Sequence, residues 1–110
     1  MEKTIEIDGK QVTFKSTGAV PKRYKMQFGR DFFSDLLSMN IGNKKKLSVE
    51  DMRSIDFDVF YDISWTLVKT ADNTIPEPLT WLDSFESFPI IEILPQIQDL
   101  LIASIQSKKN

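Results

Sequence analysis

The sequence predicts an α+β fold in which an N-terminal β-hairpin packs on a bundle of about four helices. Near the N-terminus, apolar and polar residues alternate with a period of two around an Asp-Gly pair. Most of the remaining chain places apolar residues three and four positions apart, as on one face of a helix. The 110 residues are enough to bury one hydrophobic core. We therefore expect a single domain over residues 1–110, with the hairpin in 1–16 and the helices in 21–107.

The first expected element is the hairpin. Asp8 and Gly9 are the residue pair that favours a type I′ turn of two residues between antiparallel strands. This turn brings four apolar side chains to one face of the two strands, namely Ile5, Ile7, Val12 and Phe14. Because an isolated hairpin is marginally stable in water, this face is expected to pack on the helices.

A long amphipathic helix is expected from Pro21 to about Asn40. Proline is favoured at the start of a helix, where its missing N–H has no cost. Gly29 inside this helix would cost about 1 kcal/mol relative to alanine, which suggests a close backbone approach at that point. Gly42 is placed to end the helix. One face carries large apolar residues, namely Tyr24, Phe28, Phe32, Phe33, Leu36 and Leu37.

The middle of the chain predicts a short helix and then a long one. Ser48 and Asp51 have the spacing of a capping box, which opens a turn of helix. A longer helix is expected from about residue 56 to residue 71, because its apolar residues follow helical spacing. Two prolines within residues 72–79 prevent that helix from continuing.

Two further helices are expected in the last third of the chain. Thr80 is followed three residues later by an acid, which predicts a threonine N-cap. Pro89 can open the last helix, and Pro95 is expected to kink or restart it. The tail from residue 107 onward is expected to be frayed. The short helix that Thr80 opens is expected to hold Trp81, Leu82, Phe85 and Phe88.

The composition excludes several kinds of chemistry. The sequence contains no cysteine and no histidine, which removes disulfides, Cys/His metal sites and histidine-based catalytic triads. Its four glycines are too dispersed to form a phosphate-binding loop. We assign no catalytic, cofactor-binding or metal-ligating residues and expect that the protein is not an enzyme. Without a long apolar stretch or a signal-peptide core, it is expected to be cytoplasmic and not to associate with membranes.

The charges are distributed unevenly along the chain. Residues 1–49 carry ten basic and five acidic residues, whereas residues 50–110 carry four and eleven. This asymmetry has two interpretations. The first half could present a basic surface to nucleic acid, or the two halves could attract each other within a chain or head to tail between chains.

The aromatic residues are the most informative candidates for function. The chain has eight phenylalanines and two tryptophans, more than one small core obviously needs, and three of these ten lie between Pro78 and Pro89. Each aromatic taken singly is best interpreted as core, but exposed aromatics in this segment would mark a protein interface. The predicted interface adds the apolar side of the last helix and comprises Trp81, Phe85, Phe88, Leu94, Ile97, Leu101 and Ile105.

Several segments resemble a known family. Residues 14–24, followed by residues 28–31, resemble the hairpin-to-helix junction of the tail assembly chaperones of long-tailed (siphovirus-type) phages and prophages of Gram-positive bacteria. The resemblance covers nearly the whole chain, and residues 41–56 contribute least to it. The second half of the family is matched by residues 71–72, 75–76, 81–85 and 93–95.

The resemblance implies a chaperone without enzymatic activity that acts in the cytoplasm of the bacterial host. Such a protein binds the tape measure protein, keeps it soluble and promotes assembly of the tail tube around it. The tail tube protein and further copies of the chain are additional candidate partners, and no cofactor is implied. The family often also makes a longer form by ribosomal frameshifting, and an A-rich codon run for residues 108–110 would permit it.

The alternative function is that of a small phage or bacterial regulator that binds nucleic acid through its basic N-terminal half. The net charge of −2 argues against this alternative. Its affinity for nucleic acid would be sensitive to salt. It requires one shared surface for Lys22, Arg23, Lys25, Arg30 and residues 44–46.

Overall fold

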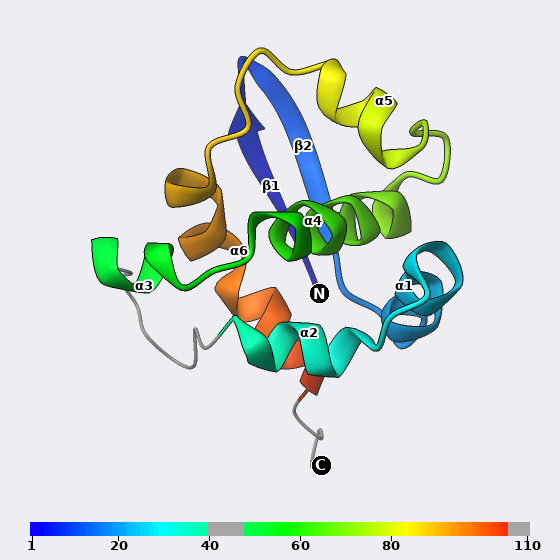
Figure 1. The fold of residues 1–110 in the computed structure, drawn as a ribbon. Helices are drawn as coiled ribbons and strands as arrows, with labels where there is room; N and C mark the ends of the chain where they lie inside the picture. The colour runs from blue at the N-terminus through cyan, green and yellow to red at the C-terminus, as the bar shows by residue number, and fades with distance from the viewer. Residues whose placement is uncertain (40–47, 106–110) are drawn as a thin grey trace.

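The computed structural model describes residues 1–39 and 48–105, except for the side chains of Met52 and Ile105. The described residues form one antiparallel two-stranded sheet and six helices, so the predicted α+β class is confirmed (Figure 1). The sheet consists of β1 (Glu2–Ile7) and β2 (Lys10–Lys15). Helix α4 packs against β2, and α6 packs against β1.

The hairpin forms as predicted. Asp8 and Gly9 have φ values of 55° and 74°, the left-handed conformation that both central residues of a type I′ turn require. Ile7 pairs with Lys10 across the turn, and the register continues to the strand ends. The face that was expected to pack on the helices is buried, and it comprises Ile5, Ile7, Val12 and Phe14.

The expected helix from Pro21 to about Asn40 is wrong, because the chain forms two helices there. Helix α1 (Val20–Phe28) ends at Gly29, whose φ of 72° is left-handed and whose N–H bonds the carbonyl of Lys25 at 2.8 Å. Asp31 then caps α2 (Phe32–Ser38), accepting a hydrogen bond from the backbone N–H of Ser34 at 2.8 Å.

Gly29 therefore serves as a helix C-cap and not as an interior contact. A Cβ atom built at this glycine would meet no atom within 4 Å, so no backbone approaches it closely. Its role is conformational, since residues with a side chain rarely adopt positive φ. The predicted helix end at Gly42 lies outside the described residues.

The next two helices form where the capping box and the apolar spacing predicted them. Before α3 (Val49–Arg53), the backbone N–H of Ser48 donates to the carboxylate of Asp51 at 2.8 Å, and the N–H of Asp51 donates back to the hydroxyl of Ser48 at 3.1 Å. Helix α4 (Phe57–Ala71) begins after Asp56, whose carboxylate accepts from the N–H of Asp58 at 2.9 Å.

Helix α5 (Pro78–Asp83) starts earlier than predicted. Pro78 occupies its first turn, and Glu77 stands at the N-cap position without a side-chain cap. Thr80 lies inside the helix, so its predicted role as the N-cap is wrong. Phe85 and Phe88 follow the end of the helix instead of lying within it.

The last helix, α6 (Ile90–Ile105), continues through Pro95, so the predicted restart does not occur. Proline removes one N–H from the helical ladder. In the same turn, the side-chain amide of Gln96 donates to the carbonyl of Glu92 at 2.9 Å. The expected frayed tail lies outside the described residues.

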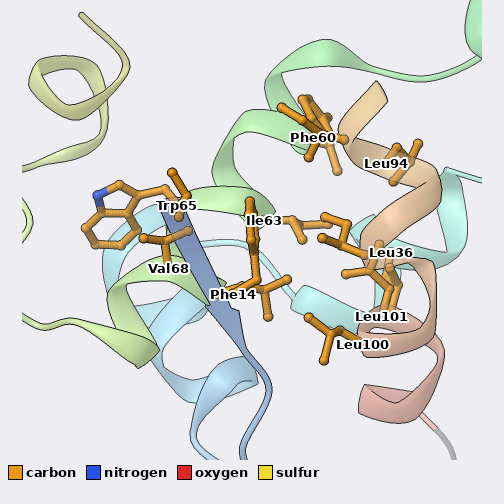
Figure 2. Close-up of a cluster of buried hydrophobic side chains, with 14 of the residues drawn as sticks. Phe14, Leu36, Phe60, Ile63, Trp65, Val68, Leu94, Leu100 and Leu101 are labelled. Atoms are coloured by element: carbon orange, nitrogen blue, oxygen red, sulfur yellow. The ribbon is translucent and has the colours of Figure 1, made fainter. Parts of the chain in front are cut away.

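The hydrophobic core lies where β2, α2, α4 and α6 meet. Figure 2 shows Phe14 of β2 beside Ile63 of α4, with Leu100 of α6 nearby. All three side chains are essentially inaccessible to solvent. The largest of the other fully buried side chains are Tyr24, Phe32, Met39, Phe60, Leu67, Ile93, Leu94, Ile97 and Leu101.

Candidate protein interface

Five residues of the predicted interface lie in the core, so these side chains do not form an exposed surface in the structure. Phe88 is half-buried and packs against the core. The side chain of Ile105 lies outside the described part of the chain. The buried members are Trp81, Phe85, Leu94, Ile97 and Leu101.

The three aromatic residues between Pro78 and Pro89 are shielded from solvent because they pack on each other and on α4. The ring of Trp81 lies 5.2 Å from the ring of Phe85 and 5.2 Å from that of Phe88. Phe88 in turn lies 5.8 Å from Phe60 and 6.2 Å from Tyr61, both on α4. Ring centroids at these separations are in direct contact. We call Trp81, Phe85 and Phe88 the aromatic cluster.

The tip of the hairpin also packs against the aromatic cluster. The ammonium of Lys10 lies 4.9 Å from the centre of the Phe85 ring and donates a hydrogen bond to the carbonyl of Ser84. The carboxylate of Asp8 accepts from the backbone N–H of Glu86 at 2.9 Å. The hairpin therefore fixes a segment more than seventy residues away in the sequence and leaves this cluster little free surface.

Apolar surface is found instead on α2. Phe33 and Leu37 are one helical turn apart and have exposed fractions of 37% and 65%, whereas Phe32 and Leu36 of the same helix are buried. We call Phe33 and Leu37 the α2 surface. In the sequence both belong to the apolar stripe of the expected longer helix, and periodicity alone does not predict their exposure. Among the side chains that the structure describes, the other large apolar ones that are exposed are Met1, Met26, Val49, Phe57, Leu79 and Ile91.

A charged network holds the α1–α2 junction against α4. Arg30 donates to the carboxylate of Asp35 at 2.8 Å and to that of Asp62 at 2.6 Å. The hydroxyl of Tyr24 donates to Asp35 at 2.6 Å and accepts from Arg30 at 3.0 Å. Because Asp62 belongs to α4, this network orients α2 and hence the α2 surface.

The network also shifts the acidity of its members. Burial raises the pKa of Tyr24, and the hydrogen bond to Asp35 raises it further. The pKa of Arg30 is raised above its usual value, first by the hydrogen bond to Asp35 and then by that to Asp62. Burial raises the pKa of the Asp62 carboxyl, and Arg30 acts in the opposite direction by stabilising the ionised form.

Replacing Arg30 with glutamine is expected to lower the free energy of unfolding by about 1–2 kcal/mol at pH 7. The effect stays below that of a fully buried pair because the Arg30 side chain is 43% exposed. In the variant, Asp62 loses its cationic partner, so its pKa rises further. When the Asp62 carboxyl has a higher pKa in the folded protein than in the unfolded chain, the folded state binds a proton more readily. This contribution to stability is fully present below the unfolded-state pKa and is lost as the pH rises through the folded-state pKa.

The destabilisation caused by Arg30→Gln should therefore shrink when urea unfolding is repeated at about pH 4.5, near the unfolded-state pKa of aspartate. Arg53→Gln is the matched control, because Arg53 pairs with Glu50 at 3.8 Å and both are exposed. This control should change stability by less than about 0.5 kcal/mol at either pH. An Arg30→Gln effect that grows as the pH falls would contradict this account of Asp62.

The basic residues that nucleic-acid binding would require have different environments in the described structure. Arg30 is already engaged by two carboxylates. Lys22 and Arg23 line a groove between α1 and α4, whereas Lys25 is exposed and does not line it. Residues 44–46 lie outside the described residues.

Among the described residues, no group of three or more acidic side chains is arranged to hold a metal ion. In the same part of the chain, no helix is long and apolar enough to cross a membrane. Comparisons with protein-family models, with curated proteins and with solved structures gave no match.

Proposed function

We propose that the protein is a phage tail assembly chaperone without enzymatic activity, which binds the tape measure protein, keeps it soluble and promotes assembly of the tail tube. The resemblance of residues 14–24 and 28–31 to this family supports the proposal. The structural observation that carries it is the α2 surface, where two apolar side chains of one helix face solvent.

The geometry of the α2 surface suits the binding of another helix. Phe33 and Leu37 are spaced by four residues, so they form a short apolar stripe along the axis of α2. An amphipathic partner helix can lay its own apolar stripe against such a pair. Family resemblance implies a tape measure chain that is long, helical and partly apolar, and a stripe of this kind would cover its apolar face.

Helix α2 is also held rigidly before any partner binds. Its N-terminus is capped by Asp31, and its first turn is tied to α4 through Arg30 and Asp35. Ordering a flexible segment on binding would cost part of the interaction free energy. A fixed helix avoids that cost, so a small apolar surface can contribute usefully to binding.

Co-expression with the tape measure protein tests the proposal. We expect the chain to keep the tape measure protein in the soluble fraction. The double substitution Phe33→Ser and Leu37→Ser should reduce that soluble fraction about fivefold or more, because a few apolar contacts dominate most interfaces. The double variant itself should remain folded, since both side chains already contact solvent.

Leu79→Ser is the matched control for surface hydrophobicity. Leu79 is 69% exposed and lies on α5 instead of α2. This variant should support the same tape measure solubility as the unmodified chain. The proposal is wrong if the tape measure protein is equally soluble without the chain. The assignment to α2 is wrong if the double variant performs as well as Leu79→Ser.

A further inference from the structure

A basic groove lies between α1 and α4, on a part of the molecule that the proposed function does not use. Its volume is about 440 Å³. The groove is lined by three basic side chains, those of Lys22, Arg23 and Lys69, and by no acidic side chain. Met26 adds apolar surface to its walls, which Trp65 also lines.

Helical spacing and hydrogen bonds fix the α4 side of this groove. Trp65 and Lys69 are one turn apart, and the ammonium of Lys69 lies 5.8 Å from the centre of the Trp65 ring. That ammonium also donates to the carbonyls of Asn73 and Ile75 at 2.8 and 2.9 Å. The indole N–H of Trp65 is satisfied by the carbonyl of Pro76 at 2.9 Å, and the residue is only 3% exposed, so the apolar wall of the groove is the 75% exposed Met26.

The positive charge of the groove is only partly balanced within the described residues, because Lys69 lies close enough to Asp72 to add to the hydrogen bonds that lower the pKa of that carboxyl. Neither Lys22, Arg23 nor Lys69 forms an ion pair with a described carboxylate, in contrast to Arg30, which forms two. The Nε atom of Arg23 is buried and has no hydrogen-bond partner there. Lys22 and Arg23 therefore carry the part of the positive charge that attracts an anionic group from outside, and the local repulsion between them falls when one binds.

We propose that the α1–α4 groove binds an acidic, amphipathic segment of a partner protein. Carboxylates of that segment contact Lys22 and Arg23, and an adjacent apolar side chain packs on Met26. Charge complementarity selects the acidic residues, and the apolar wall selects a peptide over a bare anion. The inference does not depend on whether the tape measure protein is the partner of the α2 surface.

The observations favour a protein segment over nucleic acid. The groove combines its cations with the largely exposed side chain of Met26, whereas Trp65 is 3% exposed and offers no ring face on which a base could stack. Nucleic-acid binding usually spreads many cations along a surface. Here the nearby Arg30 is neutralised by carboxylates of the same chain.

The test uses the full chain and two short peptides, one built of glutamate and leucine and one in which glutamine replaces every glutamate. Amide and indole chemical shifts locate the bound peptide, and a titration gives its affinity. We expect the acidic peptide to shift the signals of α1 and of the Trp65 indole. The glutamine peptide should bind about tenfold more weakly or not at all.

Two charge reversals on α1 give matched variants. Lys22→Glu changes a residue that lines the groove, and Lys25→Glu changes an exposed residue of the same helix that does not. The first should weaken binding of the acidic peptide about tenfold, and the second by less than about twofold. Met26→Ala should weaken it as well, whereas a purely electrostatic attraction would leave it unchanged.

Several results would overturn the proposal. Equal affinity for the two peptides, or equal effects of the two charge reversals, would show that the groove does not select an acidic segment. Tighter binding of a single-stranded oligonucleotide at the same signals would assign the groove to nucleic acid. Self-association that Lys22→Glu abolishes and that the acidic peptide blocks would show that a second copy of the chain occupies it.

Discussion

Replacing Phe14 with alanine is expected to lower the free energy of unfolding by about 3–5 kcal/mol, as measured by chemical denaturation. The Phe14 side chain is fully buried, and Figure 2 shows it beside Ile63 of α4. Removing the ring leaves a cavity that surrounding helices fill only in part, so packing is lost together with the hydrophobic contribution. A typical domain is stable by about 5–15 kcal/mol, so the loss would be a large fraction of the total.

Phe57→Ala is the matched control for this substitution. Phe57 is also a phenylalanine, but it is the first residue of α4 and its side chain is exposed. Its replacement should cost less than about 1 kcal/mol. A Phe14→Ala effect as small as that of the control would show that the hairpin does not dock on the helices.

The second large effect is expected for Trp81→Ala, at about 3–5 kcal/mol of unfolding free energy. Trp81 is buried, and its ring contacts both other members of the aromatic cluster. Its loss would leave a cavity between α5 and the segment that the hairpin tip holds. Trp81→Phe keeps most of the ring and should cost clearly less, in the same denaturation experiment.

Leu79→Ala provides the control within the same helix, because Leu79 is mostly exposed. It should change stability by less than about 0.5 kcal/mol. If Trp81 were instead part of an exposed binding surface, as the sequence suggests, the Trp81→Ala variant would fold normally. A stability close to that of Leu79→Ala would restore that interpretation and contradict the burial described above.

The parts of the fold that the sequence predicts correctly depend on local signals. The Asp8-Gly9 turn requires two residues that tolerate positive φ, and the hairpin register follows from it. The capping box of α3 acts within three residues. Each of these signals has one structural solution, so the sequence alone is sufficient to identify it.

The break between α1 and α2 could not be resolved in the same way. Gly29 is compatible with a helix interior at a modest cost and with a left-handed C-cap. The apolar stripe continues across the break, which favours one long helix on periodicity alone. What decides between them is the Asp31 cap together with the contacts of Arg30 to Asp35 and Asp62, the last of which lies in a distant helix.

The burial of the predicted interface could not be resolved from the sequence for a related reason. Periodicity and composition identify Trp81, Phe85 and Phe88 as apolar but do not say whether anything covers them. Their burial results from α4 and from the hairpin tip, which contribute Phe60 and Lys10 across long sequence separations. The exposure of the α2 surface also depends on the tertiary structure, since α2 is oriented by its contacts to α4.

Hydrogen exchange of the chain, with and without the tape measure protein, is the most direct test of the claim that α2 carries the binding surface. Binding should slow the exchange of backbone amides in α2 (Phe32–Ser38) and leave residues 81–101 unchanged. Slower exchange confined to residues 81–101, with α2 unchanged, would contradict the account and return the interface to the aromatic cluster and α6.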